Sequence, residues 1–262
     1  MKIKITALAV ALAVTVTVSA TAQDAYKKCL YVAGTDTLLY RELAPEKAGS
    51  GKFPLVVFLH GAGERGCDNE KQLTHGAQMF LNPINLKKYQ AYVIFPQCPD
   101  DCYGAYSEQP ASFLPADMPT PDQPTKYVKM IRGLVSKYIH EKKVEPTQVY
   151  LVGLSMGAMT LYDLAARYPT MWAAAVAICG TVNTDRLEPA RDIKFRIYHG
   201  DADMVVPVEA GREIYLKLKK LNTTVEYVEY PAVAHGSWVN AFGERDFLKW
   251  IFSQSAPAQS AK

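Results

Sequence analysis

The sequence lacks the features that would assign it to most classes of binding protein. Its 262 residues include 29 basic and 26 acidic ones, and neither sign gathers into a run. Nucleic acids and anionic membranes attract fields of positive charge, so a near-neutral chain favours neither as a partner. No motif recurs at a fixed period either, and the sequence therefore offers no sign of a solenoid or propeller.

Long apolar runs are absent except at the amino terminus. Two lysines precede an apolar run at residues 5–18, and small residues follow it as far as Ala22. This order predicts a signal peptide over residues 1–22, cleaved after Ala22 or alternatively after Ala20. A membrane anchor is the other interpretation, but a spanning helix needs roughly 20 apolar residues. We expect a secreted or periplasmic protein that does not associate with membranes after cleavage.

No shift in composition marks an internal domain boundary. Hydrophobic residues make up 49% of the chain, enough for a substantial core, and the length fits one α/β domain. We expect this domain to occupy residues 23–253. The last residues, 254–262, are rich in Ala, Ser, Gln and Pro, and this composition predicts a disordered tail.

Short β-rich runs alternate along the chain with helical ones, which predicts an α/β fold with a mostly parallel sheet and helices on both faces. An antiparallel hairpin with its turn at residues 34–36 is expected at the start of the sheet. The expected strands are residues 30–32, 38–43, 55–59, 92–95, 149–152, 174–179, 195–198 and 225–229. The last is expected near an edge because its charges alternate. Apolar spacing predicts helices over residues 125–142, 158–168, 208–221 and 238–252.

Ser155 lies between two glycines in the stretch Gly153-Leu154-Ser155-Met156-Gly157. Glycines two residues before and two after a serine permit a tight, strained turn that exposes the hydroxyl group. So short a pattern also arises by chance in loops. Here a predicted strand precedes it and a predicted helix follows, which is the context of a nucleophile elbow. We therefore predict that Ser155 is a nucleophile.

A serine nucleophile needs a base, and the base needs a carboxylate that orients it. His235 follows the last predicted strand, at the sheet edge where the carboxyl ends of parallel strands gather. His60 and His199 end strands and are expected to be structural. Asp201 and Asp203 both follow the seventh predicted strand. We predict that Asp203 is the acid because its loop is held by apolar residues, with Asp201 as the alternative.

These motifs together resemble the α/β-hydrolase superfamily over residues 55–252. The resemblance rests on Leu59-His60-Gly61-Ala62-Gly63, Gly153-Leu154-Ser155-Met156-Gly157, His199-Gly200-Asp201-Ala202-Asp203 and His235-Gly236. Within the superfamily, this chain resembles a narrower group at Gly61 to Gly66, Asp68-Asn69, Pro96 to Pro99 and His235 to Trp238. That group is the secreted bacterial carboxylesterases, some of which are described as predicted peptidases. The resemblance implies one α/β-hydrolase domain that hydrolyses esters with a serine and no cofactor or metal.

A tetrahedral intermediate needs two N–H donors for its oxyanion. In this fold one donor follows the nucleophile and the other lies in the loop after the third strand. Met156 and Ala62 occupy those places. The glycines around Ala62 let the loop turn closely over a substrate carbonyl, although they can also serve only to shape a turn.

The chain has five cysteines, all of them in the predicted mature part. Disulfides persist outside the cytosol, and an odd number leaves at least one thiol unpaired in a monomer. We predict a Cys67–Cys102 bridge between two loops beside the site, with Cys98–Cys102 as the local alternative. A zinc site at Cys98 and Cys102 is less favoured because no His/Cys pair lies nearby at a suitable spacing. Cys179 ends an apolar run and is expected to stay unpaired in the core.

A long connection at residues 99–124 carries Tyr103 and Tyr106 and is expected to lie over the same sheet edge as the serine. Loops of this length are usually functional or disordered. The rings could face a sugar or phenolic group, as could Trp238, or they could only pin a surface loop. No apolar run supplies a lid for long acyl chains. We expect short-chain or aromatic acyl esters as substrates, such as acetyl or feruloyl groups on plant polysaccharide.

Two other functions are compatible with these residues. The same fold and triad cleave peptides, so a serine peptidase is the first alternative, although the chain has no room for a domain that selects peptides. The second is a binding protein on a hydrolase scaffold that has lost its activity. Such a loss usually removes a triad member, and all three candidate residues are present.

Overall fold

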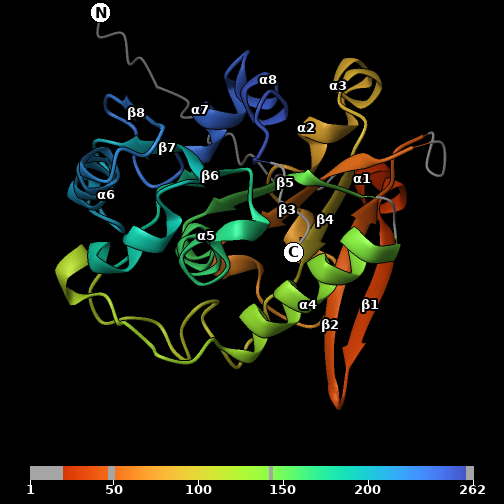
Figure 1. Ribbon diagram of the computed structural model, residues 1–262, viewed down its shortest axis with the longest axis horizontal. Helices are drawn as coiled ribbons and strands as arrows, with labels where there is room; N and C mark the ends of the chain where they lie inside the picture. Colours follow the sequence, from red (N-terminus) through yellow and green to blue (C-terminus); the bar gives the residue numbers. More distant parts are fainter. Residues whose placement is uncertain (1–19, 47–50, 142–143, 258–262) are drawn as a thin grey trace, which may run out of the picture.

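The computed structural model describes residues 20–46, 51–141 and 144–257 (Figure 1). Eight strands form one sheet in the order β1-β2-β4-β3-β5-β6-β7-β8. They are β1 (Lys27–Ala33), β2 (Asp36–Leu43), β3 (Phe53–Leu59), β4 (Tyr92–Pro96), β5 (Val144–Leu154), β6 (Ala174–Ile178), β7 (Lys194–Gly200) and β8 (Val225–Tyr230). β1 pairs antiparallel with β2, and β2 with β4, whereas all other pairs are parallel. The predicted fold class, the opening hairpin and the edge position of β8 are confirmed.

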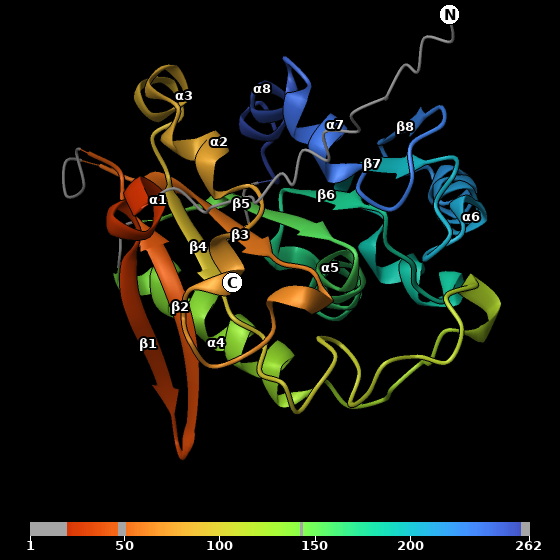
Figure 2. The same cartoon turned by 180° about the vertical axis from the view of Figure 1, so that it is seen from behind.

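Helices cover both faces of the sheet, as Figures 1 and 2 show. They are α1 (Ala20–Ala25), α2 (Ala77–Leu81), α3 (Pro83–Lys88), α4 (Lys126–Glu141), α5 (Met156–Arg167), α6 (Val208–Lys220), α7 (Trp238–Gly243) and α8 (Phe247–Phe252). Residues of α4, α5 and α6 join one hydrophobic core, and residues of α2, α7 and α8 join the other. Because both faces are covered, the central strands are apolar along most of their length.

The expected helix over residues 238–252 is in fact two short helices, α7 and α8. Glu244 follows Gly243 with φ −64° and ψ 127°, an extended conformation that ends the first helix. The second begins after Asp246, whose carboxylate lies 2.9 Å from the guanidinium of Arg196 in β7. Apolar spacing alone gives no sign of this break, because the two helices bury residues on the same face of the sheet.

Two predictions concern the ends of the chain. Residues 1–19 of the predicted signal peptide lie outside the described residues, as do residues 258–262 of the predicted tail. The start of that tail is ordered instead: the N–H of Ala256 donates to the carbonyl of Thr147 at 2.8 Å, and the Tyr150 hydroxyl donates to the carbonyl of Gln254 at 2.8 Å. The chain is therefore attached to β5 beyond its last helix.

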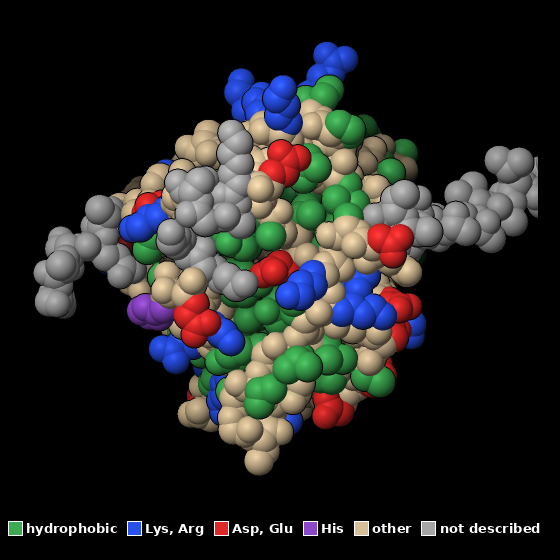
Figure 3. Space-filling model, turned by 90° about the vertical axis from the view of Figure 1, so that its right-hand side faces the viewer, with side chains coloured by type: hydrophobic (Ala, Val, Ile, Leu, Met, Phe, Trp, Pro, Cys, Tyr) green, Lys and Arg blue, Asp and Glu red, His purple; other side chains and the backbone are tan. Residues whose placement is uncertain are grey.

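The edge strand β1 and helix α4 lie on the side of the molecule that Figure 3 presents. Acidic, basic and apolar side chains alternate over this face. The large exposed apolar side chains of β1 are Leu30 and Val32, and the exposed lysines Lys27 and Lys28 begin the strand. Charged residues on an edge strand hinder its pairing with another chain. In the described part of the chain, no helix has the length and apolar character needed to cross a bilayer.

A buried ionic cluster attaches α5 to neighbouring segments. Asp163 in α5 is fully buried and accepts hydrogen bonds from Arg167 and Arg186. Arg186 lies in the 3₁₀ helix Thr184–Ala190. Arg167 also donates to the carbonyl of Asp122 at 2.8 Å, in the long connection that follows β4. The later part of the helix that follows Ser155 is thus attached to both segments.

Candidate active site

Ser155 lies at the corner between β5 and α5 in a backbone conformation that few residues other than glycine adopt, with φ 52° and ψ −120°. The surrounding backbone leaves no space for a side chain at position 153 or at position 157. A Cβ atom on Gly157 would lie 2.1 Å from the carbonyl oxygen of Leu59, and one on Gly153 would lie 2.5 Å from the carbonyl oxygen of Gly157. Both glycines of the predicted elbow are therefore required, Gly153 by a contact within the turn and Gly157 by a contact with the end of β3.

Ser155, His235 and Asp203 form one chain of hydrogen bonds. The Oγ atom of Ser155 lies 2.9 Å from Nε2 of His235, and Nδ1 of His235 lies 2.8 Å from Oδ2 of Asp203. Ser155 is 8% exposed, and the Asp203 side chain is fully buried. The structure thus brings together the three residues selected from the sequence, from loops that follow β5, β7 and β8.

Asp203 is held in its ionised form. Burial alone would raise the pKa of this carboxyl group, but hydrogen bonds from His199, His235 and the backbone N–H of Val205 hold it well below its usual range. The N–H groups of Val205 and Val206 donate to Oδ1 at 2.8 and 3.0 Å. An ionised Asp203 accepts the Nδ1 proton of His235, which leaves Nε2 free to accept the serine proton.

The alternative acid, Asp201, serves a different purpose. Its side chain is exposed, and Oδ1 accepts the N–H of Ala232 at 2.6 Å. Ala232 has φ 58°, so this bond secures a strained residue in the loop that leads to His235. Asp201 therefore helps to shape the histidine loop and does not contact the imidazole in the way that Asp203 does.

His199 contacts the acid, a role that the sequence did not indicate. Its Nε2 atom lies 2.9 Å from the carbonyl oxygen of Val206 and 3.4 Å from Oδ2 of Asp203. His199 is fully buried. As expected it lies at the end of β7, but its ring also contacts the Asp203 carboxylate. The spacing of four residues in His199-Gly200-Asp201-Ala202-Asp203 is the only sequence signal that could have suggested the contact.

His60 sets the direction of the Gly61–Ala62 peptide. Its Nε2 atom accepts the N–H of Cys98 at 2.9 Å, so the ring proton resides on Nδ1, which donates to the carbonyl of Gly61 at 2.6 Å. The carbonyl and N–H of a trans peptide point in opposite directions. A carbonyl fixed by His60 therefore fixes the direction of the Ala62 N–H. The sequence predicts only a structural residue at the end of a strand for His60 and contains no signal for this role.

Arg65 and Glu64, at the end of the same loop, connect it to other segments. Arg65 donates from Nε to the carbonyl of Ala62 and from Nη1 to the carbonyl of Cys102, each at 3.1 Å. Burial raises the pKa of the Glu64 carboxyl group, against the opposing effect of the Gly61 N–H. His75 faces this carboxyl group, with its Nε2 atom 3.6 Å from Oε1. The loop is thus rigidly supported.

The two predicted oxyanion donors lie next to the serine. Ala62 begins a short 3₁₀ turn, Ala62–Glu64, directly after Gly61. A Cβ atom on Gly61 would be 3.9 Å from that of Ser155, which shows how closely this loop approaches. Met156 is the first residue of α5, where backbone N–H groups have no acceptor within the helix.

The expected display of aromatic rings by the long connection is wrong for Tyr103 and Tyr106. They are 4% and 3% exposed, and they pair through backbone hydrogen bonds of 2.8 and 3.1 Å. The guanidinium group of Arg65 lies 5.3 Å from the centre of the Tyr103 ring. Both rings pin the loop, which was the alternative interpretation. They are buried because long-range packing, invisible in the local sequence, covers them.

Trp238 remains beside the site as expected. Its ring centre is 5.6 Å from that of His235, edge to face, and 5.1 Å from that of His75. It is only partly buried. His75 joins this cluster from the loop before α2, a position for which the sequence contained no signal.

The predicted Cys67–Cys102 bridge is not formed. Cys67 is an exposed free thiol, and the sulfur of Cys102 lies 3.5 Å from that of Cys98 instead. The turn Cys98-Pro-Asp-Asp-Cys102 brings its own ends together, whereas Cys67 points to solvent. Cys179 is a buried free thiol, as expected.

Sequence and structural comparison identifies the family. The profile of the phospholipase/carboxylesterase family matches residues 46–249, which is most of the chain. The chain belongs to this family. The esterase relatives and the fold of this chain agree with the α/β-hydrolase resemblance seen in the sequence. The protein is therefore a carboxylic ester hydrolase.

Three relatives illustrate the match. This chain is 24% identical over 201 residues to a protein of rice (Oryza sativa subsp. japonica) named probable carboxylesterase Os04g0669600. The match covers 72% of this chain and 83% of the rice protein. A solved thermostable esterase is 30% identical with a TM-score of 0.78, covering 88% of this chain but only 64% of the other. A ferulic acid esterase from Anaeromyces mucronatus, solved with ferulic acid, is 18% identical with a TM-score of 0.60, covering 87% and 90%. That last likeness concerns the fold alone.

Asp203 and His235 also belong to a cluster of side chains of the kinds that bind metal ions. The donor atoms of Cys179, Asp203 and His235 all lie within 4.8 Å of one another, which is compatible with a metal ion. Burial raises the pKa of the Cys179 thiol to about 12. A protonated thiol is a poor metal ligand, and the two other residues already bond to each other. The chemistry of this group therefore favours the hydrogen-bonded triad over a metal centre.

The buried His60 predicts how the stability of the esterase depends on pH. Burial lowers the pKa of His60 to about 4, whereas the ring of an unfolded chain titrates near 6.5. Between these values the unfolded state binds a proton that the folded state does not, so the free energy of unfolding falls as pH decreases from about 6.5 to 4. This residue accounts for a slope of up to about 1.4 kcal/mol per pH unit.

Urea unfolding of the wild type and of His60→Gln at a series of pH values measures this slope. The variant is expected to be less stable at pH 7 and to show a shallower decline on acidification. His140→Gln, which alters an exposed histidine on α4, is the control and should match the wild type. Parallel pH profiles for His60→Gln and the wild type would contradict the assignment of a buried, neutral His60.

Proposed function

We propose that the esterase is a serine carboxylesterase in which Ser155 is the nucleophile, His235 the general base and Asp203 the residue that orients the base. The observation that carries the proposal is the unbroken chain of hydrogen bonds of 2.9 and 2.8 Å from Ser155 Oγ through His235 to Asp203. It ends in a carboxylate whose pKa is lowered by its hydrogen bonds, and such a carboxylate stabilises the imidazolium formed during attack.

The reaction proceeds in two halves. His235 removes the proton of Ser155 as Oγ attacks the ester carbonyl, and then returns it to the departing alcohol, which leaves an acyl group on Ser155. Water, deprotonated by the same imidazole, attacks the acyl-enzyme, and the imidazolium returns the proton to Ser155 Oγ as the acid leaves. In both halves the N–H groups of Ala62 and Met156 stabilise the oxyanion, supported by the His60 bond to the Gly61 carbonyl.

The proposed substrates are esters with short-chain or aromatic acyl groups, such as acetyl or feruloyl groups on plant polysaccharide. Exposed apolar residues follow two members of the proposed triad closely in the sequence: Met204 and Val205 come directly after Asp203 and are 93% and 52% exposed, and Val239 comes four residues after His235 and is 70% exposed. Exposed apolar side chains of this kind can pack against a flat ring, whereas a long acyl chain needs a covered apolar groove. A ferulic acid esterase solved with ferulic acid has the same fold, so this fold accommodates such an acyl group in at least one enzyme.

We further propose that residues 1–22 direct export, so that the esterase acts outside the cytosol. The lysines, the apolar run and the small residues up to Ala22 support this location. Polysaccharide esters are large and occur outside cells, and an exported enzyme meets them directly.

Replacing Ala62 with proline tests the oxyanion assignment because it removes one N–H and little else. Gly61 has φ −77° and ψ −179°, an extended conformation that a following proline accepts, and the first position of a helical turn tolerates proline. Steady-state kinetics should show kcat lower by about 100- to 1,000-fold, the usual cost of one lost donor. Gly63→Ala is the matched control, since a Cβ atom there meets nothing within 4 Å.

An Ala62→Pro enzyme that unfolds like the wild type and retains its kcat would show that Ala62 is not a donor. If Gly63→Ala lost as much activity as Ala62→Pro, the effect would belong to the loop as a whole and not to the N–H group.

A panel of acetyl, butyryl, feruloyl and decanoyl esters tests the substrate class, with a peptide anilide as an additional substrate. We expect the highest kcat/KM for acetyl or feruloyl esters. Trp238→Ala should lower kcat/KM for the feruloyl ester by roughly 3- to 10-fold more than for the acetyl ester, the usual worth of an aromatic contact. Trp250→Ala is the control, because Trp250 is hydrogen-bonded to Glu226 at the opposite end of β8. It should change kcat/KM for the feruloyl and acetyl esters by the same factor. Preference for the decanoyl ester or the anilide would refute the assignment.

A further inference from the structure

Two thiols approach each other in the connection that follows β4. The sulfur atoms of Cys98 and Cys102 are 3.5 Å apart, close enough for a hydrogen bond between them. Cys98 is buried, whereas Cys102 is only partly buried. Closing a disulfide of about 2.05 Å needs a small movement of one side chain. The pair plays no part in the proposed ester hydrolysis.

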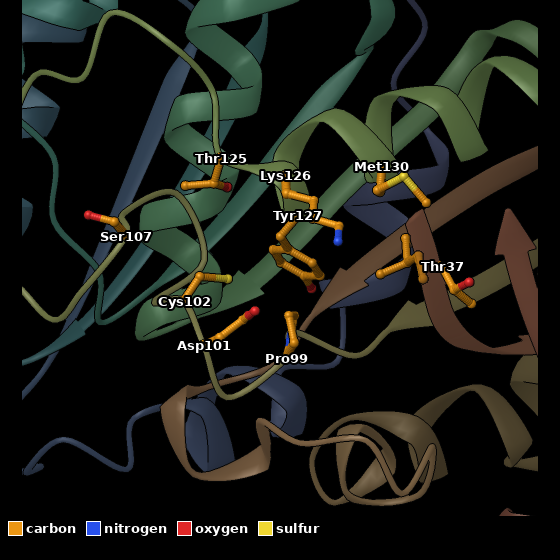
Figure 4. A pocket seen from close by; sticks show the side chains of 10 residues that line it. Thr37, Pro99, Asp101, Cys102, Ser107, Thr125, Lys126, Tyr127 and Met130 are labelled. Carbon is orange, nitrogen blue, oxygen red and sulfur yellow. The ribbon is translucent and has the colours of Figure 1, made fainter. Parts of the chain in front are cut away.

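One of the two sulfurs is open to small molecules. Cys102 lines a cavity of about 320 Å³ between the connection, the tip of β2 and the start of α4. Figure 4 shows its sulfur directed towards Tyr127, with Thr125 and Asp101 on either side. Lys126 lines the same cavity. A small disulfide can therefore reach Cys102 through this opening, while Cys98 lies behind it.

The hydrogen bond between the sulfurs makes them unequal. The Cys98 thiol lowers the pKa of Cys102 against the opposing effect of burial, whereas the pKa of Cys98 is raised. Thiolates are the attacking species in disulfide exchange, and Cys102 is the thiol that lines the cavity, so Cys102 reacts first. Cys98 is placed to react second, as a resolving thiol.

The backbone of both cysteines supports the loop that contains Ala62. The N–H of Cys98 donates to His60, which bonds to the carbonyl of Gly61. The carbonyl of Cys102 accepts a hydrogen bond from Arg65, which also donates to the carbonyl of Ala62. A covalent link between Cys98 and Cys102 would hold both supports at a fixed separation.

We propose that Cys98 and Cys102 form a reversible redox pair, oxidised by a small disulfide of the glutathione class that enters through the cavity. The Cys102 thiolate attacks one sulfur of glutathione disulfide and releases one glutathione thiolate, leaving a mixed disulfide. Cys98 then loses its proton, attacks the Cys102 sulfur and releases the second glutathione. Two protein thiols are oxidised, one disulfide is reduced, and the two protons end on two glutathione molecules. The effect on the oxyanion loop rests on the proposed function, but the exchange itself does not.

Mass mapping of the full chain in glutathione buffers of graded redox ratio tests the exchange. After alkylation and tryptic digestion without reduction, the peptide that contains both cysteines should lose the mass of two hydrogen atoms and escape alkylation in oxidising buffer. It should be alkylated twice, after unfolding, in reducing buffer. Cys67→Ser should behave like the wild type, whereas Cys102→Ser and Cys102→Ala should abolish closure.

A bridge from Cys67 to Cys102, a lasting mixed disulfide on Cys102 alone, or no oxidation by excess glutathione disulfide would each overturn the redox pair. A second measurement addresses the loop: Tm should rise on oxidation of the wild type and of Cys67→Ser, and should not change for Cys102→Ser. If closure occurs without any change in Tm, the exchange stands and its support of the oxyanion loop is refuted. Neither measurement depends on ester hydrolysis, so a failure of the proposed function is distinguished from a failure of the pair.

Discussion

The tight contact between Gly157 and the end of β3 is the constraint on which the site depends. Only glycine lets α5 start with its first turn against the carbonyl oxygen of Leu59. This contact holds Ser155 at φ 52°, a strain on the order of 1–3 kcal/mol that the surrounding sheet has to offset. The Ser155 N–H donates to the carbonyl of Ile178 at 2.9 Å, which anchors the corner to β6. The same contact brings the loop after β3 next to the serine.

The order of the strands supplies the rest of the arrangement. β5, β6, β7 and β8 are parallel neighbours, so the loops after β5, β7 and β8 leave the same edge of the sheet. Ser155, Asp203 and His235 meet there although they are far apart in the chain. Each then depends on backbone groups: Asp203 on the N–H groups of its own loop, and the Ala62 peptide on His60. The site is thus prepared electrostatically by neutral donors, namely backbone N–H groups and imidazole rings.

Local patterns in the sequence were sufficient for features that local physics controls. Strand positions follow from apolar runs, and Ser155 was identifiable because a predicted strand precedes its two glycines and a predicted helix follows them. Asp203 was separable from Asp201 by its apolar surroundings. Contacts between distant segments were not predictable. The burial of Tyr103 under Arg65, the bond from Cys98 to His60 and the division of the last helix at Glu244 each depend on residues that meet only after folding.

The central claim is that folding alone makes Ser155 reactive, and labelling with a fluorophosphonate probe measures this most directly. The probe phosphonylates a serine that a neighbouring base activates, and peptide mass mapping locates the modified residue. The account predicts that the folded protein is labelled at Ser155, that protein unfolded in urea is not labelled, and that the folded Ser155→Ala variant takes up no probe. Labelling of another serine in the folded protein, or equal labelling of folded and unfolded chains, would contradict it.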